Sequence, residues 1–317
     1  MGSLAQISSL AKNKKPFLFV ISYDKSEIFV EELDNIGDIY YKLDDKSNIE
    51  IIKSIKTHHL YKNPISFKEY KKSIDRVKNE IKNGNSYLLN LTFKTQIETN
   101  LSLKDIFLAS NAKFKLYFQD KFICFSPERF IEIKGNKIST YPMKGTIDAD
   151  IPNAKEKILN STKEMAEHTM MVDLMRNDLG IIGNSIEVEK FRYIDKVLAG
   201  EKKLLQVSSK ISAKLDNNWQ RNLGDILDKI LPAGSITGTP KKKTIELIDD
   251  IEDYQRGFYS GIFGIFDGEN LDSSVMIRFI EKDEKRLFYK SGGGITIDSN
   301  DKDEYQEMID KIYLPFL

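Results

Sequence analysis

The sequence predicts an α+β fold, in which helices pack on antiparallel sheets, and two observations lead to this prediction. Strands occur in groups whose members are joined by very short turns, such as Gly135-Asn136 between 129–134 and 137–141. Parallel neighbours need a crossover of about a dozen residues, so these strands can pair only as antiparallel hairpins. A helix-rich middle separates the two groups of strands, and such segregation is typical of α+β folds.

The first 65 residues are expected to form a small β-rich piece. Residues 17–23 make a continuous apolar run, and 28–33 make a second run after the turn Asp24-Lys25-Ser26. Runs of this length between turn residues are typical of buried strands. No linker, repeat or low-complexity tract marks a firm boundary after this piece.

A helix is expected after Ser66, because Ser66-Phe-Lys-Glu69 is a capping-box pattern and Gly84 provides a stop signal. One apolar stripe runs along this helix and consists of Tyr70, Ile74, Val77 and Ile81. The strands expected after the helix are 86–96, 113–118, 121–126, 129–134 and 137–141, and those expected late in the chain are 261–266, 274–281 and 286–291.

The composition excludes several classes of partner. The chain has 317 residues with 48 basic and 48 acidic side chains, so it lacks the basic excess of a nucleic-acid binder. No apolar run approaches the roughly 18 residues that span a bilayer, and Met1–Gln6 shows no secretion signal. A cytoplasmic protein is therefore expected. The single cysteine, Cys124, excludes an internal disulfide and a multi-cysteine metal site.

Two expected helices carry paired carboxylates. Glu164 and Glu167 lie three residues apart within 161–180, and Glu304 and Glu307 do so within 301–311, so each pair lies on one helix face. Facing helices of this kind could hold a hard cation such as Mg²⁺. The alternatives are a solvated helix face, or helix capping by Ser161 and Asp301. Capping accounts only for the first Glu of each pair, so Glu167 and Glu307 are the better candidate ligands.

Lys144 and Glu128 are candidate catalytic residues. Lys144 follows an expected strand within Tyr141–Thr146, where it could act as a nucleophile if burial lowered its pKa. The alternative is a solvated loop lysine. Glu128 lies at a strand junction within Ser126–Phe130 and could act as a general acid if partly buried. The alternative for Glu128 is an ion pair with Arg129.

Two glycine clusters stand out. Residues 234–241 lack the spacing of a Walker loop, so nucleotide binding is not supported. Residues 291–294 are expected to follow a strand and to expose consecutive backbone N–H groups to a carboxylate, with Arg278 on the preceding strand as a bidentate partner. Either cluster could also be an ordinary turn. The three histidines (His58, His59 and His168) and Cys124 give no credible triad and no Cys–His glutaminase.

Taken together, these motifs resemble the chorismate-utilising enzymes, and most closely the aminodeoxychorismate synthase component I group. The resemblance runs from about Ser66 to the C-terminus, and its segments are 126–130, 142–146, 166–178, 234–241, 256–261, 275–278, 291–295 and 304–307. Lys144 indicates the subgroup, because the anthranilate, isochorismate and salicylate synthases typically carry Ala there. The resemblance implies a sandwich-like core of antiparallel sheets with helices outside. It also implies a chorismate-binding catalytic domain over 66–317, on which a reduced N-terminal region, 1–65, packs.

The resemblance further implies a reaction and its site. Chorismate would be aminated at C4 to 4-amino-4-deoxychorismate, the first step of 4-aminobenzoate and folate synthesis. Lys144 would add to C2 as the C4 hydroxyl leaves with a proton from Glu128, and ammonia would then attack C4 and expel the lysine. Glu167 and Glu307 would hold Mg²⁺, with Glu164 and Glu304 in a second tier. The residues implied to contact the substrate are Thr237, Gly238, Tyr259, Arg278, Gly292, Gly293, Gly294 and Lys311.

The sequence also departs from the family pattern. Gln206 stands where relatives commonly carry a His that is tied to chemistry at the ring, and no tryptophan motif is found in 1–65, so tryptophan feedback is not expected. The chain carries no amidotransferase and no fused lyase, so a separate glutamine amidotransferase subunit is expected to supply ammonia and a further enzyme to complete 4-aminobenzoate. The alternatives are anthranilate synthase component I and a non-catalytic chorismate-binding subunit.

Overall fold

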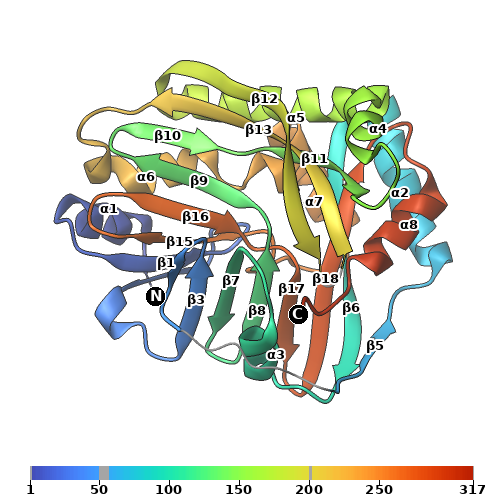
Figure 1. Cartoon of the computed structure of the whole chain (residues 1–317), viewed down its shortest axis with the longest axis horizontal. Coiled ribbons are helices and arrows are strands. Elements are labelled where there is room, and N and C mark those ends of the chain that lie inside the picture. Colours follow the sequence, from blue (N-terminus) through green and yellow to red (C-terminus); the bar gives the residue numbers. More distant parts are fainter. Residues whose placement is uncertain (1, 50–56, 200–201, 317) are drawn as a thin grey trace.

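Two antiparallel sheets with helices around them make up the computed structural model, which describes residues 2–49, 57–199 and 202–316 (Figure 1). Among these residues each sheet has nine strands. The first sheet has the order β11-β13-β10-β9-β16-β15-β1-β2, with β12 also paired to β13. The second has the order β14-β6-β18-β17-β8-β7-β3-β4, with β5 also paired to β6.

The elements are numbered in chain order, and Figure 1 colours the chain from blue at the N-terminus to red at the C-terminus. The strands of the first sheet are β1 (Phe17–Ile21), β2 (Ile28–Glu32), β9 (Arg129–Lys134), β10 (Lys137–Thr140), β11 (Met143–Asp148), β12 (Asn184–Ala199), β13 (Lys202–Lys214), β15 (Ile262–Phe266) and β16 (Leu271–Val275). The strands of the second sheet are β3 (Ile39–Leu43), β4 (Lys46–Ser47), β5 (Leu60–Asn63), β6 (Leu88–Thr99), β7 (Phe114–Phe118), β8 (Phe122–Ser126), β14 (Gly238–Thr239), β17 (Phe279–Asp283) and β18 (Arg286–Ile295).

Helices lie on the outer sides of the sheets. The α-helices are α1 (Leu4–Lys12), α2 (Phe67–Lys82), α3 (Leu103–Ala109), α4 (Ala154–Asn160), α5 (Thr162–Ile182), α6 (Leu223–Ile230), α7 (Lys241–Ile251) and α8 (Asp301–Asp310). Short 3₁₀ turns are η1 (Leu33–Asn35), η2 (Trp219–Asn222) and η3 (Gly234–Ile236). None of the helices in the described ranges combines the length and the apolar character needed to cross a membrane.

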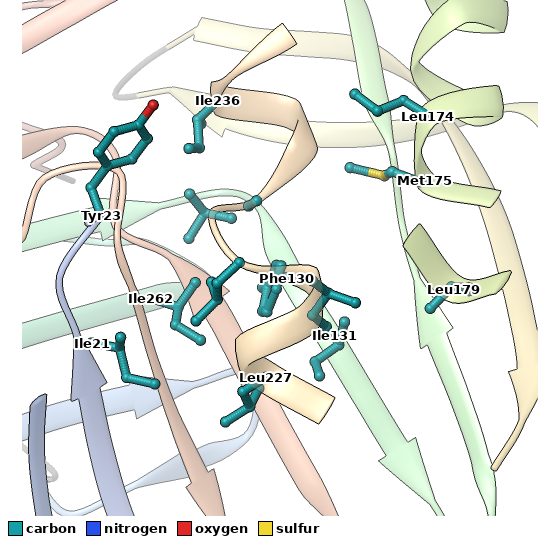
Figure 2. Close-up of a cluster of buried hydrophobic side chains, with 14 of the residues drawn as sticks. Ile21, Tyr23, Phe130, Ile131, Leu174, Met175, Leu179, Leu227, Ile236 and Ile262 are labelled. Carbon is teal, nitrogen blue, oxygen red and sulfur yellow. The ribbon is translucent and has the colours of Figure 1, made fainter. Parts of the chain in front are cut away.

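The apolar core is divided by the two sheets. A first cluster fills the space between them and includes Leu18, Val20, Phe263 and Ile265 of the first sheet and Leu116, Phe122, Cys124 and Phe279 of the second. A second cluster lies under helices on the outer faces, where side chains of α5 and α6 approach Phe130, Ile131 and Ile262 of the first sheet (Figure 2). The same cluster includes Leu89, Leu91 and Phe93 of the second sheet. Two antiparallel sheets that enclose one core and bury their outer faces under helices confirm the predicted α+β fold class.

Several local predictions are confirmed. Ser66 caps α2 in a complete capping box with Glu69, and Tyr70, Ile74 and Val77 are buried along one stripe. The helix ends at Lys82, and Gly84 follows in the left-handed region with φ +77°. The short hairpins β7–β8 and β9–β10 pair antiparallel as expected.

Other predictions are wrong. The strand expected over 274–281 is two strands in different sheets, β16 and β17, because the chain crosses between the sheets at residues 276–278 and Arg278 has φ +52°. The strand expected over 286–291 continues to Ile295, so the three glycines lie inside β18 and pair with β6. The middle of the chain is rich in helices as expected, with α4 to α7, but the long strands β12 and β13 within it were not expected.

The N-terminal residues are divided between the two sheets. The sequence predicted a β-rich piece, and β1 and β2 belong to the first sheet while β3, β4 and β5 belong to the second. The helix α1 in this segment was not expected; Ser3 caps it and its Ile7 and Ala11 are buried. The described part of 1–65 therefore contributes strands to both layers of the core.

One buried ion pair connects several segments. Arg256 donates to both carboxylate oxygens of Glu252 at 2.8 and 2.6 Å, and also to the backbone oxygens of Ile236 and Asn90. Glu252 accepts from the backbone N–H and the hydroxyl of Thr92. The end of α7, strand β6 and turn η3 are thus held together by charged groups that water does not reach, since both side chains are at most 2% exposed.

We expect Arg256→Met to lower the free energy of unfolding by about 3–5 kcal/mol, because the change leaves the Glu252 carboxylate buried without its partner. The measurement is equilibrium unfolding in urea. The matched control is Arg76→Met, which removes the exposed pair with Asp250 and should cost about 0–1 kcal/mol. Equal small losses in the two variants would contradict this role for Arg256.

Candidate active site

A cavity of about 500 Å³ opens where the two sheets and helices α5 and α8 meet, and we call it the main cavity. Its lining residues are Leu88, Asn90, Pro127, Glu128, Met143, Lys144, Gly145, Thr146, Glu164, Met171, Gln206, Ser235, Ile236, Tyr259, Ile277, Arg278, Lys290, Ser291, Gly292, Gly293, Gly294, Glu307 and Lys311. Most of the site residues expected from the sequence are therefore brought together, although they come from seven separate stretches of the chain.

The cavity depends on where β17 begins. Strand β18 pairs with β6 along one edge as far as Ile295, but it pairs with β17 along the other edge only up to Lys290. Beyond Lys290 this second edge faces the cavity, and in an antiparallel strand only alternate N–H groups point toward one edge. The expected run of consecutive free N–H groups at residues 292–294 is therefore wrong.

Lys144 lies at an irregularity in β11. The pairs Met143↔Ser208 and Thr146↔Gln206 show one extra residue in β11, and Gly145 has φ +90°. The Lys144 ammonium forms an ion pair with Glu167 at 2.9 Å. Burial lowers the pKa of Lys144, but the nearby carboxylates of Glu167, Glu307 and Glu164 outweigh burial, so the pKa is raised. The lowered pKa on which the sequence hypothesis depended is not found in this state.

Glu128 is a buried acid. Its carboxyl accepts a short hydrogen bond from the Ser235 hydroxyl, and its own backbone carbonyl accepts from Ser274. Burial raises the pKa of Glu128 to about 7, although the bond from Ser235 opposes the shift. Arg129 pairs with Asp272 and Asp44, so the alternative of a Glu128–Arg129 ion pair is not supported. A carboxyl group with this pKa can donate a proton near neutral pH.

Four carboxylates approach the cavity from α5 and α8. Glu164 and Glu307 line it, and Glu167 lies against Lys144. The Glu304 carboxylate accepts a hydrogen bond from the Ser299 hydroxyl at 2.8 Å. Glu304 and Glu307 both lie close to Gly293, because a Cβ added at Gly293 would be 3.6 Å from a carboxylate oxygen of Glu304 and 3.6 Å from one of Glu307. Asn300, not Asp301, caps α8, so the capping interpretation is wrong for that helix; Ser161 does cap α5.

The fit of these carboxylates to a metal ion is partial. Oxygen donors without sulfur or imidazole suit a hard cation such as Mg²⁺. In the part of the chain that the structure describes, however, no three His, Cys, Asp or Glu side chains are grouped closely enough to hold a metal. Instead, two lysines form ion pairs with these carboxylates: Lys144 with Glu167 at 2.9 Å and Lys311 with Glu307 at 2.6 Å. The donor chemistry fits a magnesium site, and the site would require these lysines to move.

Cationic groups converge on the same cavity. Lys311 also donates to the Gly292 carbonyl at 2.7 Å, and Lys290, which is 2% exposed, donates to the Arg256 carbonyl. The guanidinium of Arg278 lies over the Tyr313 ring, and its buried Nε has no hydrogen-bond partner among the described residues. An anionic ligand would provide that partner, because guanidinium groups bind carboxylates strongly.

Two expected substrate contacts lie outside the lining. The Thr237 hydroxyl is fully buried and donates within its own turn to the carbonyls of Ala233 and Gly234. Gly238 has φ +143° and packs so closely on β6 that a Cβ would lie 1.9 Å from the Leu88 carbonyl oxygen. Both residues lie directly beside lining residues, Thr237 next to Ile236 and Gly238 against Leu88. Their contact with substrate stays a prediction.

Sequence reasoning missed several lining residues. Ser235 lies in the glycine cluster 234–241, from which only Thr237 and Gly238 were expected to contact substrate, and Asn90 and Lys290 are polar residues within largely apolar stretches of β6 and β18. A polar residue within a largely apolar strand segment was the sequence signal that could have indicated these lining positions. His168 lies outside the lining; it is fully buried and shares a hydrogen bond with the Ser209 hydroxyl at 2.7 Å.

Comparison with known proteins identifies relatives over the whole chain. A family model described as chorismate binding enzyme matches residues 5–315. A protein of Haemophilus influenzae named "uncharacterized PabA-like protein" is 47% identical over 314 residues, which cover 98% of this chain and 96% of the relative.

Relatives with assigned activities are less similar and longer. Aminodeoxychorismate synthase component 1 of Salmonella typhimurium is 33% identical over 261 residues, covering 77% of this chain and 56% of the relative. Anthranilate synthase component 1 of Archaeoglobus fulgidus is 33% identical over 256 residues, covering 78% and 61%. This chain therefore spans little more than half the length of these two relatives. Because both sequence identities are 33%, they do not indicate which of the two activities this chain has.

The fold is similar to that of a solved structure. The menaquinone-specific isochorismate synthase MenF of Escherichia coli superposes with a TM-score of 0.78 at 16% identity, covering 98% of this chain and 81% of that one. At 16% identity this similarity shows the fold alone and says nothing about the activity.

We expect Glu128→Gln to become progressively more stable than the unmodified protein as the pH rises from 5 to 8. The pKa of Glu128 is about 7 in the folded state and 4.5 without burial, so the folded state holds the extra proton between these values and loses stability as pH rises through them. Gln carries no such penalty, and the full difference is on the order of 3 kcal/mol.

Urea unfolding of both proteins at pH 5 and pH 8 measures this difference. Ser235→Ala serves as the companion variant, because removal of a hydrogen bond that lowers the pKa should extend the pH dependence to higher pH. A stability difference between Glu128→Gln and the unmodified protein that is equal at both pH values would contradict the raised pKa.

Proposed function

Because the chain belongs to the family of chorismate-binding enzymes, we propose that it converts chorismate to 4-amino-4-deoxychorismate, the first step of 4-aminobenzoate and folate synthesis. The observation that carries the proposal is that Lys144 and Glu128 line the same cavity. The resemblance to aminodeoxychorismate synthases assigns the nucleophile to Lys144 and the proton donor to Glu128. Anthranilate-forming relatives typically carry Ala at the position of Lys144.

The charges of the main cavity are suited to a dicarboxylate such as chorismate. Three cations line it: Lys290 of β18, Arg278 at the crossing between the sheets and Lys311 at the end of α8. Lys290 pairs with Glu281 and Lys311 with Glu307, whereas the buried Arg278 Nε lacks a hydrogen-bond partner among the described residues. Fixed cations in a site of low water content bind carboxylates more strongly than cations in bulk water do. We assign these three side chains, with Tyr259 and the backbone at residues 292–294, to substrate binding.

The proposed reaction has two substitutions. The Lys144 ammonium first gives a proton to the adjacent Glu167 carboxylate. The amine then bonds to C2 while the ring double bonds shift and the C4–O bond breaks, and the hydroxyl leaves as water with the proton of Glu128. Ammonia bonds to C4, the double bonds shift back and the C2–N bond to Lys144 breaks, and the ammonium formed at C4 returns a proton to Glu128. Two easier steps replace one difficult substitution, which is the general advantage of covalent catalysis. A Glu128 pKa of about 7 keeps much of this acid protonated at neutral pH.

We also propose a magnesium site formed by Glu167 and Glu307, with Glu164 and Glu304 behind them. The donor set of carboxylates suits Mg²⁺. When bound, the ion would supply positive charge between these carboxylates and a carboxylate of the substrate. Without such a charge, four glutamates beside a dianion would repel it.

Ammonia is proposed to come from a separate glutamine amidotransferase subunit. The only cysteine, Cys124, is fully buried in β8, and burial raises the pKa of its thiol. A thiol of this kind cannot serve as the nucleophile of a glutaminase, because the thiolate is the reactive form. The chain therefore needs external ammonia for the amination.

Anthranilate synthesis is the second candidate, because a relative with that name is as similar as the aminodeoxychorismate synthase. We expect purified protein with chorismate, Mg²⁺ and an ammonium salt to form 4-amino-4-deoxychorismate, identified by mass spectrometry, without release of pyruvate. Direct formation of fluorescent anthranilate with pyruvate would overturn the proposal, and ligand binding without any turnover would favour a non-catalytic binding subunit.

We expect Lys144→Ala to abolish amination and also to abolish a covalent adduct. Protein incubated with chorismate without ammonia should gain the mass of dehydrated chorismate on the peptide that contains Lys144. The control is Lys137→Ala on β10, a lysine paired with Glu189 outside the main cavity, which should retain both the adduct and the activity. Amination at the normal rate by Lys144→Ala would remove the covalent mechanism.

A further inference from the structure

A second cavity of about 340 Å³ adjoins the main cavity, and we call it the side cavity. It shares Pro127, Thr146, Gln206 and Arg278 with the main cavity, so these four residues form the boundary between the two. Its other lining residues are Lys42, Asn111, Ala112, Lys113, Phe125, Ser126, Lys196, Leu204, Tyr313 and Pro315. No step of the proposed reaction uses any of these ten residues.

The side cavity is lined by cations without acids. Lys42 of β3, Lys113 before β7, Lys196 of β12 and the boundary residue Arg278 all contribute to it, and its lining includes no Asp or Glu. Lys113 lies 3.8 Å from Asp44, while Lys42 and Lys196 form no ion pair with residues in the described ranges. Four separate chain segments thus place positive charge around one opening in a protein of zero formal net charge.

The main cavity, unlike the side cavity, has acidic lining residues. Glu164 and Glu307 line it, with Glu167 and Glu304 close by, on helices α5 and α8. A dianion that approaches past these carboxylates is repelled, whereas one that approaches past the lysines is attracted. The difference in charge between the two linings therefore favours approach of an anion through the side cavity.

We propose that the side cavity is the entrance vestibule for the anionic substrate, which first meets Lys42, Lys113 and Lys196 and then passes Arg278 into the main cavity. This inference rests on the proposed function in one respect, that the substrate is a dicarboxylate. Arg278 is suited to transfer the ligand between the cavities, because it lines both and its buried Nε lacks a hydrogen-bond partner within the described part of the chain.

The test compares chorismate association rates, measured by stopped flow without ammonia in a Lys144→Ala background that prevents covalent reaction. The double variant Lys42→Glu/Lys196→Glu should lower the association rate constant roughly 10-fold or more at low ionic strength, and the difference should shrink with added salt. The matched control, Lys15→Glu/Lys137→Glu, changes the net charge equally at exposed lysines outside both cavities and should leave the rate within about twofold.

A steric variant separates passage from long-range attraction. Ala112→Trp adds bulk to the side-cavity wall without a change of charge, and it should slow association and dissociation together while the equilibrium affinity stays nearly constant. Unchanged association in both Ala112→Trp and the double lysine variant would overturn the proposal. Weaker affinity through faster dissociation alone would also overturn it, because that result would make the side cavity part of the final binding site.

These outcomes are distinguishable from failure of the proposed reaction. Chorismate association that depends on Lys42 and Lys196 in a protein that forms anthranilate would support the vestibule and reject the amination. Formation of 4-amino-4-deoxychorismate by a protein whose chorismate association is insensitive to all three variants would do the reverse.

Discussion

The ion pair between Arg256 and Glu252 is the interaction on which the candidate site depends most. Arg256 binds the carbonyls of Asn90 and Ile236, and its own carbonyl accepts from Lys290. These three partners all line the main cavity. Burial of two charges is costly unless each of their hydrogen-bonding groups has a partner. The ion pair therefore favours one arrangement of these three lining residues.

A second constraint is the crossing of the chain between the sheets at residues 276–278. It ends β16 in one sheet and starts β17 in the other, which leaves the edge of β18 uncovered beyond Lys290. The positive φ of Arg278 is uncommon for a residue with a side chain and is associated with functional sites. The site is therefore a gap in the second sheet, and Arg278 stands at the crossing that creates it.

The parts of the fold that could be predicted from the sequence are those determined by local patterns. The capping box of α2 and the two-residue hairpins are short-range features, and they were predicted correctly. The crossing near Arg278 could not be predicted, because 274–281 reads as one strand and only pairing with distant strands divides it. For the site, the motif order predicted most of the expected residues that share the main cavity, but not Ser235, Asn90 or Lys290. It also did not predict the direction of the Lys144 pKa, which depends on three carboxylates from two helices.

The division of the N-terminal strands between the sheets affects the order in which the protein can assemble. Strand β1 is wholly buried between β2 and β15, and β15 lies some 240 residues later in the chain. During synthesis the apolar edge of β1 must wait for most of the polypeptide before its partner exists, and contacts of such long sequence separation fold slowly. Until then one edge of the apolar strand Phe17–Ile21 has no partner, although β2 can pair with the other edge, and such an open edge is prone to aggregation.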